Sequence, residues 1–365
     1  MPKKRQTKSR RAQRAALHAE EDAPLRSGPV SIKDIARSLG ISHSTVSRAL
    51  RDSPLVRAET VSEIKAKAYS MGYRPSAVAR SLVTRETRTI GVVVTTIADP
   101  FHGEVVTGIE ESAAAAGYSV ILASSHRDPE REIGVVRALQ ERRVDGILVA
   151  SSRVGDLYLS LMTEMRVPIV LINNQHDGGP VYSVSVDNER AARQAVQHLL
   201  DLGHTRIAYL GDRFGSHSNA ERLSGYQSAL NAAGIAFDSL LVAEGDSSPE
   251  GSVPGVQALL GQNPRPTALF CYNDMSSLAA LRVAAELGLS VPDDLSIVGF
   301  DDLFFAPYLQ PPLTTIHQPR REMGREATAV LMALLQGKTV NSQRIAVEGK
   351  LIVRGSTAPP PSKPS

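Results

Sequence analysis

Apolar residues between positions 30 and 72 recur at the spacing of three short amphipathic helices. The first helix begins at Ser31, whose distance from Asp34 matches a capping box, and it ends at Gly40. Ser42 can cap a second helix over 43–50, and Gly72 ends a third. The inward-facing apolar residues are Ile32, Ile35, Ala36, Leu39, Val46, Ala49, Leu50, Val61, Ile64, Ala68 and Met71. Two short helices joined by a tight turn and braced by a third predict an all-α helix-turn-helix domain at the N-terminus.

From Thr89 onward the pattern changes to apolar strand-like runs that alternate with helical stretches. The predicted strands include 90–94, 119–123, 146–150, 168–172, 205–210, 267–271 and 295–299, and the predicted helix-ending glycines are Gly117, Gly203, Gly234 and Gly288. Strands that are apolar on both faces indicate parallel sheets covered by helices on each side. About 260 residues of this pattern predict an α/β core of two doubly wound parallel-sheet subdomains.

The chain therefore divides into five predicted segments. Residues 1–28 lack hydrophobic periodicity and form a disordered basic tail, and 29–74 form the helix-turn-helix domain. Residues 75–88 are too short to hold a helix alone and are interpreted as a hinge helix and linker that orders on a partner. Residues 89–355 are the core, and the Pro-rich residues 356–365 are a second disordered tail.

Charge is distributed unevenly between the two ends. Residues 1–88 hold 19 Lys and Arg against 8 Asp and Glu, a net of +11, whereas 89–365 hold 22 against 30, a net of −8. This asymmetry suits a nucleic-acid-facing N-terminal part or, on charge alone equally well, a solvated basic tail. The single cysteine, Cys271, excludes an intrachain disulfide, and no apolar run reaches the length of a membrane span. We expect a cytoplasmic protein with no membrane partner.

Several strings, taken in order, resemble the lactose-repressor (LacI/GalR) family of transcriptional regulators over residues 30–355. They are Ser31-Ile32-Lys33-Asp34-Ile35-Ala36, Ser44-Thr45-Val46-Ser47-Arg48, Met71-Gly72-Tyr73-Arg74-Pro75, Ala79-Arg80-Ser81-Leu82, Arg142-Arg143-Val144-Asp145-Gly146, Leu202-Gly203-His204, Asn273-Asp274, Val298-Gly299-Phe300-Asp301-Asp302 and Leu313-Thr314-Thr315-Ile316. The resemblance implies a homodimer that binds double-stranded operator DNA. It also implies a periplasmic-binding-protein-like core that holds a small-molecule effector between its subdomains.

Residues of the second helix match the family's DNA-reading positions. His43, Ser44 and Arg48 are placed to meet base edges in the major groove, where Arg48 can make a bidentate contact to guanine. His43 would meet a base edge or would instead be a helix-start residue that reads nothing; its neutral form offers one donor and one acceptor, so no base is assigned to it. Ser31, Thr45 and Ser47 suit phosphate contacts. In the hinge, Ala79, Arg80 and Leu82 match minor-groove contacts; Leu82 would be an apolar wedge, or would instead pack on the core.

Polar residues that follow predicted strands match the family's effector-contacting positions. These are Asn173, Arg222, Asn273, Asp301 and Gln318, and Asn174 and Phe101 join them. Arginine, carboxamide and carboxylate groups suit paired hydroxyls, so a sugar or sugar derivative is the expected effector. Asn174 stands where purine-binding members carry a stacking tryptophan, which argues against a purine. For each residue the alternative is a strand-end cap or a bond between subdomains.

Other functional classes fit less well. A solute-binding protein of a transport system shares the core fold but would have a secretion signal and no helix-turn-helix. An enzyme would need a nucleophile, a base or a metal constellation, and we find none in the sequence. Gly337-Lys338-Thr339 is similar to the end of a phosphate-binding loop, but the position five residues earlier, where that loop needs a glycine, is Met332. We therefore expect a repressor that uses no cofactor and no metal. The effector, the operator and the direction of the response stay open.

Overall fold

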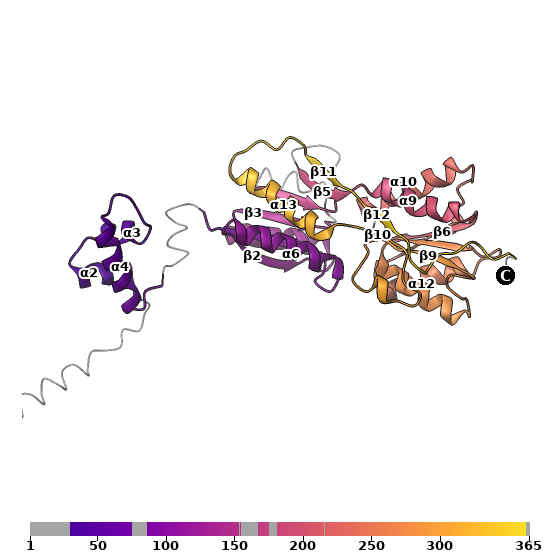
Figure 1. The fold of residues 1–365 in the computed structure, drawn as a ribbon, viewed down its shortest axis with the longest axis horizontal. Helices are drawn as coiled ribbons and strands as arrows, with labels where there is room; N and C mark the ends of the chain where they lie inside the picture. Colours follow the sequence, from indigo (N-terminus) through magenta and orange to yellow (C-terminus); the bar gives the residue numbers. More distant parts are fainter. Residues whose placement is uncertain are drawn as a thin grey trace, which may run out of the picture. The chain divides into compact units, whose positions relative to one another are not determined.

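The computed structural model describes residues 30–74, 86–152, 154, 167–174, 181–214 and 216–362. The predicted basic tail 1–28 and the hinge residues Ala79, Arg80 and Leu82 lie outside this part of the chain. Two compact units meet in the sequence between Arg85 and Glu86 (Figure 1). In the described part of the chain, no helix has both the length and the apolar character needed to cross a membrane.

The small unit consists of the three predicted helices, α2 (Ile32–Leu39), α3 (His43–Ala49) and α4 (Ala58–Ser70). The Asp34 carboxylate accepts hydrogen bonds from the backbone N–H and hydroxyl of Ser31, and Gly40 ends α2 with a φ of 65°. Ser42 caps α3 by accepting from the Thr45 N–H at 3.1 Å. The buried core is shared by all three helices and contains Ile35, Ala36, Val46, Ala49, Ile64 and Ala68. The predicted helix-turn-helix is confirmed.

The large unit contains two parallel sheets and a short antiparallel pair. The first sheet has the order β11-β5-β4-β3-β1-β2, with β1 (Thr89–Val94), β2 (Ser119–Ser124), β3 (Gly146–Ala150), β4 (Ile169–Ile172), β5 (Tyr182–Val186) and β11 (Arg344–Val347). The second has the order β7-β6-β8-β9, with β6 (Ile207–Asp212), β7 (Val242–Gly245), β8 (Ala268–Cys271) and β9 (Ser296–Val298). The antiparallel pair is β10 (Thr315–His317) with β12 (Lys350–Ile352).

Helices cover both faces of each sheet, as apolar strands require. Alternate residues of one strand enter different cores: Val92 packs in the cluster that includes α6 and α13, and Val93 packs in the cluster that includes α7. The covering helices are α6 (Pro100–Ala115), α7 (Pro129–Glu141), α9 (Asn188–Asp201), α10 (His217–Ala232), α11 (Pro249–Leu260), α12 (Asp274–Glu286) and α13 (Arg320–Leu335). Short 3₁₀ turns occur at η1 (Ser239–Leu241) and η2 (Ala306–Tyr308). Figure 1 shows α6 and α13 lying together against the first sheet.

The chain passes between the two sheets after β5, after β10 and after β11. The four predicted helix-ending glycines all have positive φ, between 71° and 98°. These features confirm the predicted pair of doubly wound subdomains. The hydrophobic pattern does not single out five of the strands. Two serines interrupt β5, β7 and β11 are incompletely buried, and β10 and β12 have only three residues each.

The predicted disordered tail at 356–365 is wrong for its first residues. Ser356 is fully buried, its Oγ donates to the Ile297 carbonyl at 2.6 Å, and the Ile297 N–H donates to the Ser356 carbonyl at 2.8 Å. The Ala358 carbonyl accepts a hydrogen bond from the Ser296 hydroxyl at 3.0 Å. An extended segment can be held by backbone partners alone, so its composition does not reveal it.

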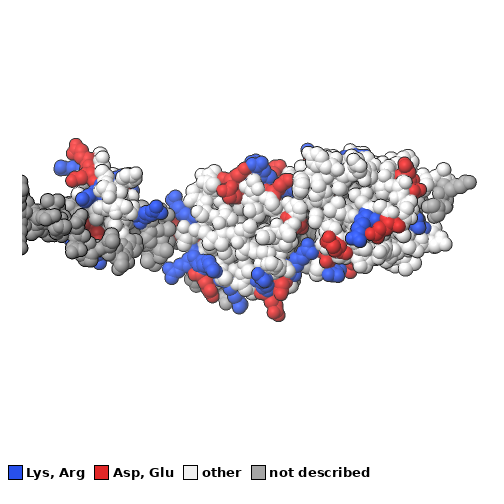
Figure 2. Space-filling view, turned by 90° about the horizontal axis from the view of Figure 1, so that it is seen from below, with Lys and Arg blue, Asp and Glu red and all other residues white. Residues whose placement is uncertain are grey.

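The balance of basic and acidic side chains differs between the two units. Residues 30–74 carry eight Lys and Arg against four Asp and Glu. On the face of the large unit in Figure 2, acidic and basic side chains are interspersed, with uncharged surface between them. The positive excess therefore belongs to the small unit rather than to a patch on this face.

The contact between α6 and α13 gives a stability prediction. A Cβ at Gly108 would overlap the Arg321 carbonyl oxygen, and one at Gly324 would overlap the Val105 carbonyl oxygen. We expect Gly108→Ala to lower the free energy of unfolding by about 1–3 kcal/mol, because overpacking outweighs the gain in helix propensity. Urea unfolding of the purified full chain measures this change.

The matched control is Gly134→Ala in α7, where a Cβ would meet no atom within 4 Å. This variant should gain about 0.5–1 kcal/mol from helix propensity alone. Equal changes in the two variants would contradict the close approach of α6 and α13.

Candidate functional site

The outer face of α3 carries the side chains predicted to contact DNA. His43, Ser44 and Arg48 are exposed, while Thr45 and Ser47 are half-buried. Within the described residues, the Arg48 guanidinium forms no hydrogen bond or ion pair, so it is available to a partner. The arrangement presents one free arginine on the helix that follows the tight turn, as a major-groove reading helix requires.

The predicted phosphate-contacting hydroxyls already have partners within the small unit. Ser31 Oγ donates to Asp34, Thr45 Oγ1 lies 2.8 Å from Ser42 Oγ, and Ser47 Oγ accepts from Arg51 Nη2 at 3.1 Å. Each hydroxyl keeps capacity for a further hydrogen bond because it has one donor and two lone pairs. These bonds fix the orientation of the hydroxyls.

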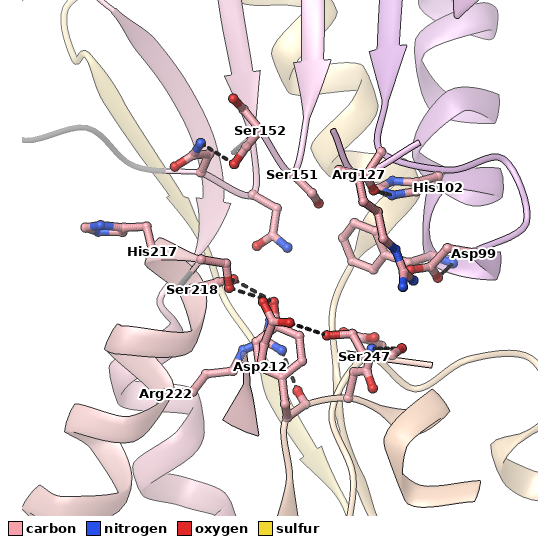
Figure 3. Close-up of a pocket in the computed structure, with 18 residues that line it drawn as sticks. Asp99, His102, Arg127, Ser151, Ser152, Asp212, His217, Ser218, Arg222 and Ser247 are labelled. Atoms are coloured by element: carbon pink, nitrogen blue, oxygen red, sulfur yellow. Dashed lines mark hydrogen bonds between the residues drawn. The ribbon is translucent and has the colours of Figure 1, made fainter. Parts of the chain in front are cut away.

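A cavity of about 610 Å³, including the solvent at its mouth, lies between the two sheets of the large unit. The cavity is lined from the first subdomain by Thr95, Asp99, Phe101, His102, Arg127, Ser151, Ser152, Asn173 and Asn174, and from the second by Asp212, Ser216, His217, Ser218, Arg222, Ser247, Tyr272, Asn273 and Asp301. Most of these residues follow the carboxyl ends of parallel strands, which is where α/β sheets bind ligands. Figure 3 shows the two groups facing each other across a common space.

Six of the seven predicted effector-binding residues line this cavity: Phe101, Asn173, Asn174, Arg222, Asn273 and Asp301. Gln318 is fully buried and is not among the lining residues. Its Nε2 donates to Asp301 Oδ1 at 2.6 Å. Gln318 therefore holds the Asp301 carboxylate from behind.

Arg222 is fixed on three sides by its surroundings. Its guanidinium lies 3.6 Å from the centroid of the Phe300 ring and 4.5 Å from that of Tyr272. Nε donates to Asn188 Oδ1 at 2.9 Å and Nη1 donates to the Tyr272 carbonyl at 2.5 Å. Nη2 has no hydrogen bond with any described residue, so a preorganised donor remains for a ligand.

Asp301 lies in the turn after β9 with a φ of 117°. Burial raises the pKa of its carboxyl group, while the nearby Arg222 opposes that rise. Its neighbour Asp274 is fully buried behind it, and burial raises the pKa of Asp274 as well, with the Asp301 carboxylate adding to the rise. The Asp274 carboxylate accepts from the Thr315 hydroxyl at 2.6 Å and the Leu303 N–H at 2.7 Å. The two carboxyl groups thus have different roles: Asp274 organises the turn and Asp301 reaches the cavity.

The three asparagines differ in how much they can offer a ligand. Asn173, with a φ of 53°, has a buried Oδ1 without a partner in the described structure. Asn174 Nδ2 donates to the Ser152 carbonyl at 2.9 Å. Asn273 uses both polar atoms, since Oδ1 caps α12 at the Ser276 N–H and Nδ2 donates to the Ser247 carbonyl. Asn173 is therefore the strongest ligand-binding candidate of the three.

The sequence prediction missed most of the polar lining. Asp212 accepts from Ser247 Oγ at 3.0 Å, and His102 Nε2 lies 2.8 Å from Thr95 Oγ1 with its buried Nδ1 unpartnered in the described structure. Burial lowers the pKa of His102, which favours the neutral imidazole. Their place in the chain could have identified these residues, because each follows a strand or lies at the start of the helix after it.

Arg127 joins the two subdomains at the cavity. It adopts a φ of 63° after β2, and its Nη1 donates to the Asp246 carbonyl at 2.9 Å. Asp246 follows β7 in the other sheet and also lies 3.6 Å from Arg213. The contact closes part of the space between the sheets and gives the cavity a second positive charge.

Comparisons with known proteins agree with this architecture. Residues 31–76 match the model of bacterial regulatory proteins of the lacI family, and residues 196–357 match the periplasmic binding protein-like domain. The HTH-type transcriptional repressor PurR of Photobacterium profundum is 34% identical over 89% of this chain and 98% of its own.

Solved structures resemble nearly the whole chain. A lac repressor dimer bound to operator and the anti-inducer ONPF has a TM-score of 0.83 and 29% identity, covering 91% of this chain and 100% of its own. A transcriptional regulator CelR-cellobiose complex has a TM-score of 0.70 and 32% identity, covering 90% of this chain and 99% of its own. The chain therefore belongs to the lacI family of bacterial regulatory proteins and is a DNA-binding transcriptional repressor rather than an enzyme.

Proposed function

We propose that a sugar or uncharged sugar derivative binds between the two subdomains and controls how tightly the repressor holds its operator. The observation that carries this proposal is the cavity itself, where Arg222 Nη2, Asn173 Oδ1 and the Asp301 carboxylate are hydrogen-bonding groups held in fixed positions. Arginine donates, and a carboxylate accepts from two hydroxyls at once, which suits the vicinal hydroxyls of a sugar.

The same lining disfavours purines and phosphosugars. The chain has no tryptophan, and Asn174 and Ser216 are among the lining residues, which include Phe101 and Tyr272 as the only Phe and Tyr of the described lining. The lining holds three acidic residues, Asp99, Asp212 and Asp301, beside two arginines, so it has no excess positive charge to attract an added phosphate. We therefore do not infer a purine effector from the similarity to the PurR repressor.

Operator binding is assigned to α3 and to the predicted hinge. Arg48 would read a guanine, with His43 and Ser44 beside it at the base edges. Leu82, which lies outside the described residues, keeps its predicted role as a minor-groove wedge with Ala79 and Arg80 next to it. A homodimer would present two such units to a palindromic operator. Ile121 and Leu122, exposed on the edge strand β2, support an interface between core units.

A thermal-shift screen tests the effector class directly. Neutral mono- and disaccharides, phosphosugars and nucleobases are each added to the full chain. A sugar present at 100 times its Kd adds about 2.7 kcal/mol of stability. Stabilisation by a nucleobase, with none by any neutral sugar, would overturn the proposal.

Base reading by α3 is tested with Arg48→Ala. Selection on randomised duplexes should show preference relaxed at one base pair by about 1–3 kcal/mol, because a bidentate arginine contact is lost. Arg37→Ala on α2 is the control, since that arginine pairs with Asp34 at 3.4 Å. Unchanged selectivity in Arg48→Ala would rule out its reading role.

The cavity is tested with Asp301→Asn, which keeps an acceptor for Gln318 but removes the charge. At pH 8, above the raised pKa of Asp301, affinity for the most stabilising sugar of the screen should fall by about 1.5–3 kcal/mol, the contribution of a hydrogen bond to a charged group. Operator affinity without sugar should persist. Asp294→Asn, in a half-buried carboxylate that accepts from the Ser290 N–H, is the control. Loss of operator binding in Asp301→Asn would instead show a structural role.

The raised pKa of Asp301 predicts a pH dependence of stability. Because burial raises this pKa, the folded protein holds the proton more tightly than the unfolded chain, whose Asp titrates near ~3.9. Stability contributed by this group therefore falls as the pH rises from about 4 through the raised folded pKa. Asp301→Asn lacks that loss, so its unfolding free energy relative to wild type should increase between pH 5 and pH 8. If the unfolding free energies of the two proteins change with pH in the same way, the raised pKa of Asp301 would be contradicted.

A further inference from the structure

The chain enters the large unit at residues 86–88, directly after residues 75–85, which the structure does not describe. Here one carboxylate binds two consecutive residues. Asp145 Oδ1 accepts from the Thr87 N–H at 2.8 Å and lies 2.9 Å from Thr87 Oγ1, while Oδ2 accepts from the Arg88 N–H at 2.8 Å. Thr87 and Arg88, which the sequence assigns to the linker, are thus bound to the core.

We call these contacts of the Asp145 carboxylate with Thr87 and Arg88 the clamp, and backbone hydrogen bonds reinforce it from both sides. The Thr87 hydroxyl also lies 2.9 Å from the Arg143 carbonyl, to which it can donate its single proton instead. The Arg88 carbonyl accepts from the Ser119 N–H at 2.9 Å, and the Asp145 N–H donates to the Thr89 carbonyl at 2.8 Å. The segment is therefore fixed in both position and direction before β1 begins.

The clamp also holds strained backbone. Arg88 has a φ of 50° and Arg143 a φ of 58°, a left-handed conformation that non-glycine residues rarely adopt. Such conformations persist only where the surroundings over-determine them, and they concentrate at functional sites. Neither arginine lies at the cavity, which is at the opposite, carboxyl ends of β1 and β3. Arg143 follows the C-cap of α7, where a left-handed residue is an ordinary helix end, so the left-handed residue that needs the Asp145 hydrogen bonds is Arg88.

We propose that Asp145 is a positioning residue for operator binding, which fixes where and in which direction the chain leaves the core toward the DNA-binding unit. This inference rests on the proposed reading of operator DNA by the small unit. Every residue released from the core lengthens the chain between core and small unit. In a dimer, that length sets the effective concentration of the second DNA-binding unit at its half-site. Specific binding, which needs both units in register, is therefore more sensitive to the clamp than non-specific binding through phosphates.

The competing interpretation is that Asp145 only orders the amino ends of β1 and β3. That role predicts a loss of stability and equal losses of affinity for all DNA. The proposal predicts a change in the ratio of operator affinity to random-duplex affinity, measured well below the melting temperature. The ratio of operator affinity to random-duplex affinity therefore distinguishes the two interpretations: it falls under the proposal and stays constant under the purely structural role.

The experiment uses the full chain as wild type, Asp145→Ala, Asp145→Asn and Thr87→Val, with Asp294→Ala as the matched control. Asp294 is likewise half-buried, precedes β9 and accepts a backbone hydrogen bond, from Ser290 at 2.8 Å, but lies in the other sheet's subdomain. Affinity is measured at one salt concentration for the duplex that wild type selects from a randomised pool and for a random duplex of equal length. Amide hydrogen exchange at Thr87 and Arg88 reports whether the clamp has opened.

Asp145→Ala should accelerate exchange at both amides and lower operator affinity more than random-duplex affinity, so that the ratio of the two falls, because both the length and the direction of the link to the small unit change. Asp145→Asn should lie between Asp145→Ala and wild type, because Nδ2 of asparagine cannot accept from Arg88. Asp294→Ala should leave both affinities within about twofold, as expected for sites distant from one another.

An unchanged affinity ratio in Asp145→Ala, with accelerated exchange at Thr87 and Arg88, would overturn the proposal. Equal losses on both duplexes would assign Asp145 a structural role only and would overturn it too. If Asp145→Ala does not fold, Asp145→Asn and Thr87→Val decide by the same ratio. A wild type that selects no duplex at all would refute operator reading, a failure distinct from that of the clamp.

Discussion

The parallel direction of the strands is the constraint on which the site depends. Parallel strands place all their carboxyl ends on one edge of a sheet, and the chain passes between the sheets after β5, β10 and β11 so that the two edges face each other. Each loop that leaves an edge must satisfy its own backbone groups, and short polar side chains do this locally. The residues that cap helices and turns here therefore also line the cavity. Asn273, which caps α12 and lines the cavity, shows this double use most directly.

Hydrogen bonding inside the cavity is incomplete at a few atoms. Most buried polar groups find a partner, as the Asp274 carboxylate does with Thr315 and Leu303. Asn173 Oδ1 and His102 Nδ1 are buried without one among the described residues. A buried polar atom without a partner costs free energy, so a ligand that supplies the missing hydrogen bonds gains the corresponding affinity. Arg222, stacked between two rings, gives up little freedom when it binds.

The sequence predicted the elements with strong periodicity and the residues placed at strand ends. The helices of the small unit, seven strands and the helix-ending glycines are found where the pattern places them, because capping, periodicity and left-handed glycines are local signals. The bond between Gln318 and Asp301 depends instead on how distant segments pack, and no local pattern encodes it. The same holds for Arg127, whose partner Asp246 is 119 residues away. Ser356 and Ala358 were missed because backbone pairing in an extended segment leaves no hydrophobic period.

The close packing of α6 against α13 couples the cavity end of these helices to their far end. Without side chains at Gly108 and Gly324 to separate them, the two helices pack backbone against backbone, and such close packing transmits a displacement of one helix to the other. One end of α6 lies at the cavity with Phe101 and His102, and after its other end the first residue of β2, Ser119, donates to the Arg88 carbonyl. Sixteen residues at ~1.5 Å each make this arm about 24 Å long. A rotation of about 5° at the cavity therefore displaces the far end by about 2 Å, at the place where the chain departs for DNA.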